Sequence, residues 1–324
     1  MTQLAYREAL RDGMAEEMRV NPDVFLMGEE IAEFQGAYKC TQGLLEEFGD
    51  KRVIDTPIAE LGFTGIATGA AMAGLRPVVE FMTWNFSMMA IDQIVNSAAK
   101  TYYMSGGLVG CPIVFRGPNG AAARVAAQHS QDFTPWYMSV PGLKVVSPCN
   151  AADAKGLLKA AIRDDAPVCI LENEILYGQS WDVPDGDYET PIGKAQILKK
   201  GTDVTLIGYS INSIKALEAA KLLEKDGISA EVLDLRSLRP MDVDAIVESV
   251  SKTHRVVICS ESWGIAGVAA EVMRIISDHC WDELDAPVLH ASGANVPMPY
   301  AKNLEAGVLP QPEDVVAKVH EVLA

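Results

Sequence analysis

Apolar and polar positions along the chain predict two successive α/β regions. In the first, Leu10, Met14 and Met18 recur every four residues, which is typical of a helix with one buried face. Short apolar runs then indicate strands, and helical stretches lie between most of them. The predicted strands of this region are 24–27, 53–54, 77–81, 112–115, 143–146 and 168–171. Strands that alternate with helices are typical of a mostly parallel, buried sheet.

The pattern lapses in a polar, turn-rich segment and then resumes. We therefore predict a first domain over residues 1–180, a linker over 181–200 and a second domain over 201–324. The strands predicted in the second domain are 204–207, 230–235, 256–259 and 287–290, and its helices include those with Val243, Ile246, Val247 and Val250, and with Val315, Val319 and Val322, on one face. The predicted fold class is α/β, with two domains that each hold a mostly parallel sheet.

Charge excludes several classes of partner. The 324 residues have a formal net charge of −17, which disfavours binding to nucleic acid or to an anionic membrane surface. No apolar stretch is long enough to cross a bilayer, and the N-terminus does not resemble a signal or transit peptide, so we expect an intracellular protein. The six cysteines show no zinc-site spacing and lie mostly in apolar runs, which favours free buried thiols.

Three residues are candidates for chemistry because of where they lie. Glu29 and Glu60 follow predicted strands, and function gathers at the carboxyl ends of parallel strands. His129 lies in a polar stretch and is a candidate for proton transfer. From position alone, solvated loop side chains are the favoured interpretation. Asp132 and Ser130 near His129 do not make a convincing hydrolase triad, because the nucleophile elbow is missing.

Three further stretches each have a structural and a functional interpretation. The glycine-rich residues 61–75 match no phosphate-binding motif, so we predict a helix packed closely against a neighbour. The glycine and proline content of residues 116–120 predicts a turn whose backbone amides approach a ligand. The aromatic residues Phe81, Trp84 and Phe86 either fill a core or line a pocket for a flat ring, and the core is the favoured interpretation.

Taken together, an ordered series of motifs resembles one family over essentially the whole chain. The motifs are Gly28-Glu-Glu-Ile31, Gly36-Ala-Tyr-Lys39, Val53-Ile-Asp-Thr-Pro-Ile-Ala-Glu60, the run from Gly65 to Pro77, Gln93-Ile-Val-Asn-Ser-Ala-Ala-Lys100, Phe115-Arg-Gly-Pro-Asn-Gly120, Gln128-His-Ser-Gln131, Pro141-Gly-Leu-Lys-Val-Val-Ser-Pro148 and Val296-Pro-Met-Pro-Tyr-Ala301. The chain resembles beta subunits of the pyruvate dehydrogenase component of 2-oxo acid dehydrogenase complexes.

The resemblance implies a thiamine-diphosphate fold, with a pyrimidine-binding domain followed by a transketolase C-terminal-like domain. The glutamate aligned with Glu60 hydrogen-bonds the aminopyrimidine nitrogen of the cofactor in that family, and Phe86 packs against the same ring. By the same resemblance, His129 is expected to assist proton and charge handling during lipoyl acylation. Glu29 is expected to belong to an acidic path that joins two active sites. The implied reaction is oxidative decarboxylation of pyruvate, with transfer of the acetyl group to a lipoyl arm.

The resemblance also implies partners and metals. Single-chain relatives hold the diphosphate through magnesium with a Gly-Asp-Gly motif, but here the nearest string is Gly186-Asp-Tyr188. An alpha subunit, in an alpha2-beta2 heterotetramer, is therefore expected to bring the magnesium. A structural potassium site is implied at Ile113, Ala161, Ile162, Asp164 and Ala166. Asp285 matches an acidic position that relatives use to bind the subunit-binding domain of the dihydrolipoyl acetyltransferase, and the carboxylate of Ala324 is a further expected contact.

Several alternatives stay open at this point. Beta subunits of branched-chain 2-oxo acid and acetoin dehydrogenases share the fold and the cofactor. A non-catalytic scaffold is disfavoured because Glu60, Phe86 and His129 occur together, and a nicotinamide oxidoreductase is disfavoured because the dinucleotide fingerprint is missing. The family implies a bacterial cytoplasmic location, or the mitochondrial matrix if a transit peptide has been removed.

Overall fold

The computed structural model describes residues 1–324, which divide into two compact units. The first unit comprises Met1–Asn119 and Trp136–Ile192, and the second comprises Gly120–Pro135 and Gly193–Ala324. Residues 120–135, expected in the first domain, are thus grouped with the second unit. No helix is both long and apolar enough to span a membrane.

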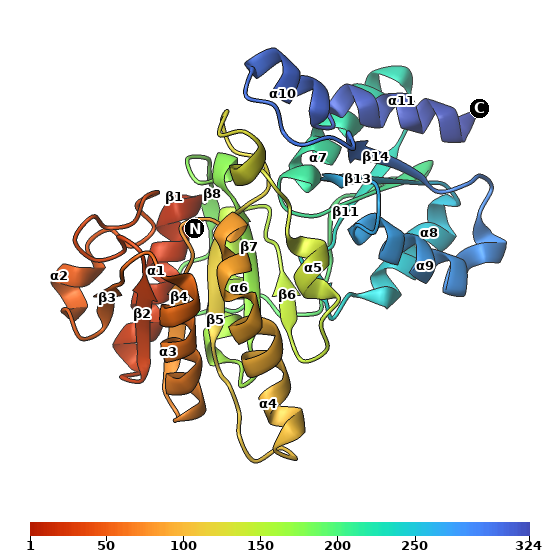
Figure 1. Ribbon diagram of the computed structural model, residues 1–324. Coiled ribbons are helices and arrows are strands. Elements are labelled where there is room, and N and C mark those ends of the chain that lie inside the picture. Colours follow the sequence, from red (N-terminus) through yellow and green to blue (C-terminus); the bar gives the residue numbers. More distant parts are fainter. The chain divides into compact units, whose positions relative to one another are not determined.

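The first unit is built on a parallel sheet of six strands in the order β6-β7-β5-β4-β2-β3 (Figure 1). The strands are β2 (Val24–Gly28), β3 (Val53–Asp55), β4 (Arg76–Glu80), β5 (Val114–Asn119), β6 (Lys144–Val146) and β7 (Val168–Asn173). Its helices are α1 (Tyr6–Val20), α2 (Leu44–Phe48), α3 (Glu60–Met72), α4 (Ala99–Met104) and α6 (Ala151–Arg163), with α5 (Thr134–Met138) crossing the division of the chain. The predicted strands and the parallel arrangement are confirmed.

Local sequence accounts for the main helices of this unit. Helix α6 begins after Asn150, whose side chain accepts a hydrogen bond from the backbone N–H of Asp153 and so caps the helix. Helices α1 and α6 pack against each other, and α3 packs against β4. The glycine-rich stretch forms α3, which confirms the predicted helix.

A two-stranded antiparallel sheet in the first unit was not predicted. Strand β1 (Thr2–Ala5) pairs with β8 (Ser180–Val183). The predicted linker also contains β9 (Gln196–Lys199), which belongs to the second unit. The linker boundaries of 181 and 200 remain a prediction, but the segment is not structureless.

The second unit contains a five-stranded sheet in the order β14-β13-β10-β11-β9. Its strands are β9, β10 (Val204–Gly208), β11 (Ala230–Asp234), β13 (Val256–Trp263) and β14 (Leu289–Gly293). The short strand β12 (Ser237–Arg239) does not belong to this sheet. Only β9 runs antiparallel to its neighbour. The helices are α7 (Ile211–Leu223), α8 (Val243–Thr253), α9 (Val268–Cys280), α10 (Lys302–Val308) and α11 (Pro312–Leu323).

Helices cover both faces of this second sheet (Figure 1). Helices α7 and α11 lie together on one face, and α8 and α9 lie on the other. The core of the first face consists of strand residues such as Leu206 and Val232, packed on Ala219 of α7 and on Val319 of α11. The apolar stripe predicted for α11 faces this core, because Val315, Val319 and Val322 are buried there. In the stripe predicted for α8, Ile246 and Val250 are buried and Val243 and Val247 are partly buried. The α/β fold class with mostly parallel sheets is confirmed.

Candidate active site

The candidate site lies at the carboxyl ends of β2 and β3 in the first unit. These strands are parallel neighbours, with Gly28 opposite Asp55. Beyond them the backbone N–H of Thr56 donates to the carbonyl of Gly28 at 3.0 Å. Residues that follow both strands therefore leave the sheet from the same edge, as the position of ligand sites in parallel sheets requires.

Asp55 holds the loop that follows β2. Its carboxylate accepts hydrogen bonds from the backbone N–H groups of Ala32, at 2.7 Å, and Glu33, at 3.1 Å. Glu30 has a φ of +57°, in the left-handed region that non-glycine residues seldom adopt. The loop is therefore turned sharply back at Glu30 and fixed there by Asp55. This role of Asp55 was not predicted, since nothing in the sequence links it to a loop more than 20 residues away.

Glu60 is the first residue of α3 and is buried, with 7% of its surface exposed. A carboxylate in the first turn of a helix is stabilised by the unpaired backbone N–H groups there. The helix packs against the segment η1 (Trp84–Ala90), so its first turn is held by tertiary contacts as well. The structure thus gives Glu60 a fixed and largely water-free position.

Glu29 lies beside Glu60, although the two are 31 residues apart in sequence. Glu29 is 4% exposed, and its Oε1 atom has no hydrogen-bond partner. Burial, the charge of Glu60 and a hydrogen bond to that carboxyl together raise the pKa of Glu29 to about 7, and burial contributes most. The pair therefore holds a proton near neutral pH, as adjacent carboxyl groups do when both cannot ionise.

The aromatic run divides between core and site. Phe81 and Trp84 are fully buried, and the indole N–H of Trp84 donates to the carbonyl of Ile170 at 3.1 Å, so both belong to the core. Phe86 is only partly buried. Because η1 packs against α3, Phe86 is carried on the segment next to the helix that begins with Glu60.

His129 lies in the other unit. It is exposed and ends the short 3-10 helix η3 (Ala127–His129), within the segment Gly120–Pro135. The sequence-predicted residues are therefore distributed over two units, with Glu29, Glu60 and Phe86 in the first and His129 in the second.

The five residues implied in potassium binding surround the turn from α6 to β7 and its neighbour strand. The guanidinium of Arg76 donates to the carbonyls of Ile162, at 3.0 Å, and Asp164, at 2.9 Å. The Asp164 carboxylate accepts from Lys144 and from the backbone N–H of Ala166. The carbonyls of Ala161 and Ile113 accept from the N–H groups of Asp164 and Val168. The oxygens of this turn thus already face two cationic side chains.

Residues 116–120 do not form the predicted ligand-binding turn. Strand β5 continues to Asn119, and Arg116 is 1% exposed. Its guanidinium forms ion pairs with Glu80 on β4 and with Glu172 on β7. The interpretation as a turn was wrong because a buried arginine between two carboxylates satisfies its charge inside the sheet, which local glycine and proline content does not indicate.

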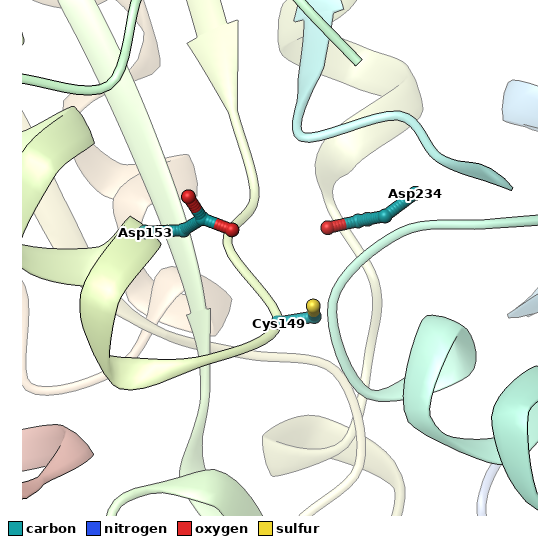
Figure 2. A group of neighbouring side chains, drawn as sticks. All are labelled: Cys149, Asp153 and Asp234. Carbon is teal, nitrogen blue, oxygen red and sulfur yellow. The ribbon is translucent and has the colours of Figure 1, made fainter. Parts of the chain in front are cut away.

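The acids Asp153 and Asp234 and the six cysteines are explained by structural roles. Figure 2 shows Cys149 and Asp153 of the first unit and Asp234 of the second. Asp153 accepts from Asn150 at 2.7 Å at the start of α6, and Asp234 accepts from the Ser213 hydroxyl at 2.7 Å. Each acid is therefore paired within its own unit. All six cysteines are free and buried, which confirms that prediction, and burial raises the pKa of the Cys111 thiol to about 12.

Comparison with known proteins identifies the family. Residues 2–179 match the model of the transketolase pyrimidine binding domain, and residues 193–315 match that of the transketolase C-terminal domain. The chain is 60% identical over 323 residues to the pyruvate dehydrogenase E1 component subunit beta of Rhizobium meliloti (strain 1021), covering 99% of this chain and 70% of that protein. The chain belongs to the pyruvate dehydrogenase E1 beta subunit family.

Other relatives agree with this assignment. The mitochondrial E1 beta subunit of Rattus norvegicus is 55% identical over 326 residues, which cover 99% of this chain and 91% of the relative. A solved structure described as an inactive beta4 tetramer of a split gene transketolase has a TM-score of 0.82 and 26% identity, and the match covers 99% of this chain and 98% of that one. The predicted transketolase-like, two-domain E1 beta subunit is confirmed.

The raised pKa of Glu29 predicts a specific pH dependence of stability. The folded protein retains the Glu29 proton up to about pH 7, whereas an unfolded glutamate loses it near its ordinary pKa of 4.5. The stability that this proton contributes is complete below pH 4.5 and declines as the pH rises through 7. Glu29→Gln removes the decline, so the variant gains on the wild type as the pH rises, by about 1.4 kcal/mol per unit of pKa shift.

Denaturant unfolding of both proteins between pH 4.5 and 8.5 measures this difference. Glu46→Gln, an exposed glutamate on α2, is the matched control and is expected to follow the wild type at every pH. A difference between Glu29→Gln and wild type that stays constant over this range would show that Glu29 ionises normally.

Proposed function

We propose that this chain is the beta subunit of a thiamine-diphosphate-dependent pyruvate dehydrogenase. The reaction is oxidative decarboxylation of pyruvate with transfer of the acetyl group to the lipoyl group of the acetyltransferase. The buried carboxyl pair Glu29–Glu60, at the sheet edge where ligands of parallel sheets bind, is the observation that supports this most directly. Relatives at 55–60% identity are named pyruvate dehydrogenase subunits, which favours pyruvate over branched-chain substrates or acetoin.

The residues present suit the pyrimidine half of the cofactor. Thiamine diphosphate, when bound, supplies a carbon nucleophile and an electron sink for decarboxylation. Glu60 offers a buried carboxyl group that can hydrogen-bond a ring nitrogen of the cofactor and exchange a proton with it. Phe86 offers a partly exposed ring for packing against a flat heterocycle.

Glu29 and His129 have supporting roles in this proposal. The unpartnered Oε1 of Glu29 and its proton near neutral pH suit it to exchange protons with Glu60, along an acidic path between active sites. His129 is exposed and is suited to transfer protons to and from a lipoyl group that arrives from solution. The first residue thus acts on the cofactor side of the reaction, and the second on the acceptor side.

An alpha subunit completes the site. The chain lacks the Gly-Asp-Gly motif, so magnesium and the diphosphate are held by the alpha subunit in an alpha2-beta2 heterotetramer. The relatives include bacterial proteins and proteins named mitochondrial. We accordingly assign the chain to the bacterial cytoplasm, or to the mitochondrial matrix if a transit peptide has been removed.

Potassium at the turn between α6 and β7 would have a structural role. Carbonyl oxygens carry two lone pairs, so those of Ile113, Ala161, Ile162 and Ala166 can accept an ion as well as a hydrogen bond. Asp164 is already paired with Lys144, and Arg76 lies against the same turn. An ion there would therefore add to an arrangement that these two side chains already hold together.

The surface around Asp285 suits a basic partner, for which we propose the subunit-binding domain of the acetyltransferase. Asp285 is exposed and lines a hollow of about 640 Å³ that also has Asp282 and the apolar residues Trp281 and Pro287 in its wall. Trp281 is 69% exposed, and an exposed indole beside carboxylates suits a lysine or arginine side chain.

Glu60→Gln is expected to abolish decarboxylation in the assembled alpha–beta enzyme. An amide still hydrogen-bonds the ring nitrogen but cannot exchange a proton with it. Turnover is therefore expected to fall by about three or more powers of ten, while cofactor affinity changes far less. The assay is pyruvate-dependent reduction of an artificial electron acceptor, with Glu46→Gln as the control. Near-normal turnover of Glu60→Gln would remove Glu60 from the mechanism.

The chain on its own is expected to bind thiamine diphosphate weakly and to have no activity. It lacks the magnesium and diphosphate ligands, which make the charge-assisted contacts to the cofactor. Calorimetric titration of the purified chain, with and without magnesium, is compared with that of the alpha–beta assembly. Tight, magnesium-dependent binding to the single chain would contradict the shared site.

Asp285→Ala is expected to weaken binding of the acetyltransferase subunit-binding domain about ten-fold or more, and to leave decarboxylation with an artificial acceptor unchanged. Because Arg255 pairs with Asp285 at 3.1 Å, Arg255→Ala is the matched control. It breaks the same ion pair but retains the carboxylate, so binding should be kept or strengthened. Equal affinity of the wild type and Asp285→Ala in a binding titration would locate the interface elsewhere.

A further inference from the structure

The segment that carries His129 is inserted between two sequence stretches of the first unit. It leaves the carboxyl end of β5 and runs from Gly120 to Pro135 as part of the second unit. A hydrogen bond from the N–H of Gly120 to the carbonyl of Gln131, at 3.0 Å, closes its base. Within it, Arg124 and Ala126 both have a φ of +63°, which side-chain-bearing residues rarely adopt. This backbone therefore depends on contacts with its surroundings to keep its form.

Those contacts come from three side chains of the second unit. Glu261 accepts from the N–H of Ala121 at 3.4 Å, and Glu305 accepts from the N–H of Arg124 at 2.9 Å. The hydroxyl of Tyr209 donates to Oδ2 of Asp132 at 2.6 Å. The acceptor is a carboxylate oxygen in all three contacts, and the Tyr209 contact is the shortest of them.

Asp132 transmits this contact to the backbone near His129. Its other oxygen, Oδ1, accepts from both the N–H and the hydroxyl of Thr134, the N–H at 2.9 Å. One carboxylate thus ties Tyr209 to the end of the segment, three residues after His129. Next to the histidine, Ser130 is buried. A shift of Asp132 would therefore move the backbone on which the imidazole is mounted.

Tyr209 itself lies at the end of a series of hydrogen-bonded polar side chains. It is 2% exposed and follows β10 directly, and burial together with the Asp132 charge raises the pKa of its hydroxyl well above the usual value. The Ser262 hydroxyl hydrogen-bonds the Tyr209 oxygen. Ser262 lies 3.2 Å from Ser260, which lies 2.8 Å from Nε2 of His290. With Ser262 beside the tyrosine oxygen, the Tyr209 proton is directed to Asp132.

The series of side chains from His290 to Tyr209 does not change charge near physiological pH. Burial lowers the pKa of His290 to about 4, so its imidazole is neutral at neutral pH. The Tyr209 hydroxyl stays protonated for the reason given above. The geometry therefore suits a permanent brace, whose hydrogen bonds persist while the site turns over.

We propose that Tyr209 is a positioning residue, which acts through Asp132 to hold the segment that carries His129 in the geometry needed for acyl transfer to the lipoyl group. The inference rests on the proposed function of His129. It predicts that Tyr209 supports the transfer step and not decarboxylation, for which the groups lie in the first unit. A mis-set proton-transfer group lowers the rate of its own step and leaves acceptor binding intact.

The test uses the assembled alpha–beta enzyme carrying Tyr209→Phe, which removes one hydroxyl and keeps the ring. Reductive acetylation of a free lipoyl domain is expected to lose about 10- to 100-fold in kcat, with little change in KM. Pyruvate-dependent reduction of an artificial acceptor is expected to stay normal, and amide hydrogen exchange is expected to quicken in residues 120–135. Tyr6→Phe is the matched control, because Tyr6 is a fully buried tyrosine whose hydroxyl donates to the Pro148 carbonyl.

Two further variants separate this inference from the proposed function. In a His129→Ala background, Tyr209→Phe should cause no additional loss of reductive acetylation, because a positioning residue acts through the group that it positions. Asp132→Asn has only one acceptor oxygen and cannot accept from both Tyr209 and Thr134, so it should lose reductive acetylation as well. Normal acetylation by Tyr209→Phe together with a large loss in His129→Ala would overturn the positioning role alone, and normal acetylation by His129→Ala would overturn the role of His129 itself.

Discussion

The parallel register of β2 with its two neighbours is the constraint on which the candidate site depends. Gly28 lies opposite Asp55 on one side and Glu80 on the other, so three strands end nearly level. A Cβ atom at Gly28 would lie 2.5 Å from the carbonyl oxygen of Glu80, so only glycine allows this approach. The level edge places the loop with Glu29 next to the chain that leads to Glu60.

Buried charges are treated in two different ways within the first unit. Arg116 is sandwiched between Glu80 and Glu172, and the hydroxyl of Tyr177 donates to Glu172 at 2.7 Å. Charge and hydrogen-bonding capacity are satisfied there, which suits a structural role. Glu29 and Glu60 have no such cation, and Glu29 retains an oxygen without a partner. Burying a carboxyl group without a cation or a hydrogen-bond donor costs stability. Such groups are found at functional sites, where a bound ligand supplies the missing contact.

Sequence patterns predicted the features that depend on local order. The helices α1, α3 and α6 and the buried strands follow from periodicity and from an N-cap, because each is decided by residues close in the chain. The pairing of β1 with β8 joins residues about 180 positions apart, and no short-range pattern encodes it. The burial of Arg116 was missed for the same reason, since its two partners lie on other strands. The motif series indicated Glu29 and Glu60 as site residues, but only the fold explains why they are adjacent.

The distribution of the candidate residues separates the two halves of the reaction. Glu29, Glu60 and Phe86, which suit the cofactor ring, belong to the first unit, and His129, which suits the acyl acceptor, belongs to the second. Each group is set by its own framework, the first by the strand ends of the parallel sheet and the second by hydrogen bonds from residues around β10 and β13. Changes in either framework should therefore affect one half-reaction more than the other. In the proposed function the enzyme must hold a reactive carbon until a lipoyl arm arrives. This independence would then allow the group proposed to receive the arm to be adjusted without disturbing the groups proposed to act on the cofactor.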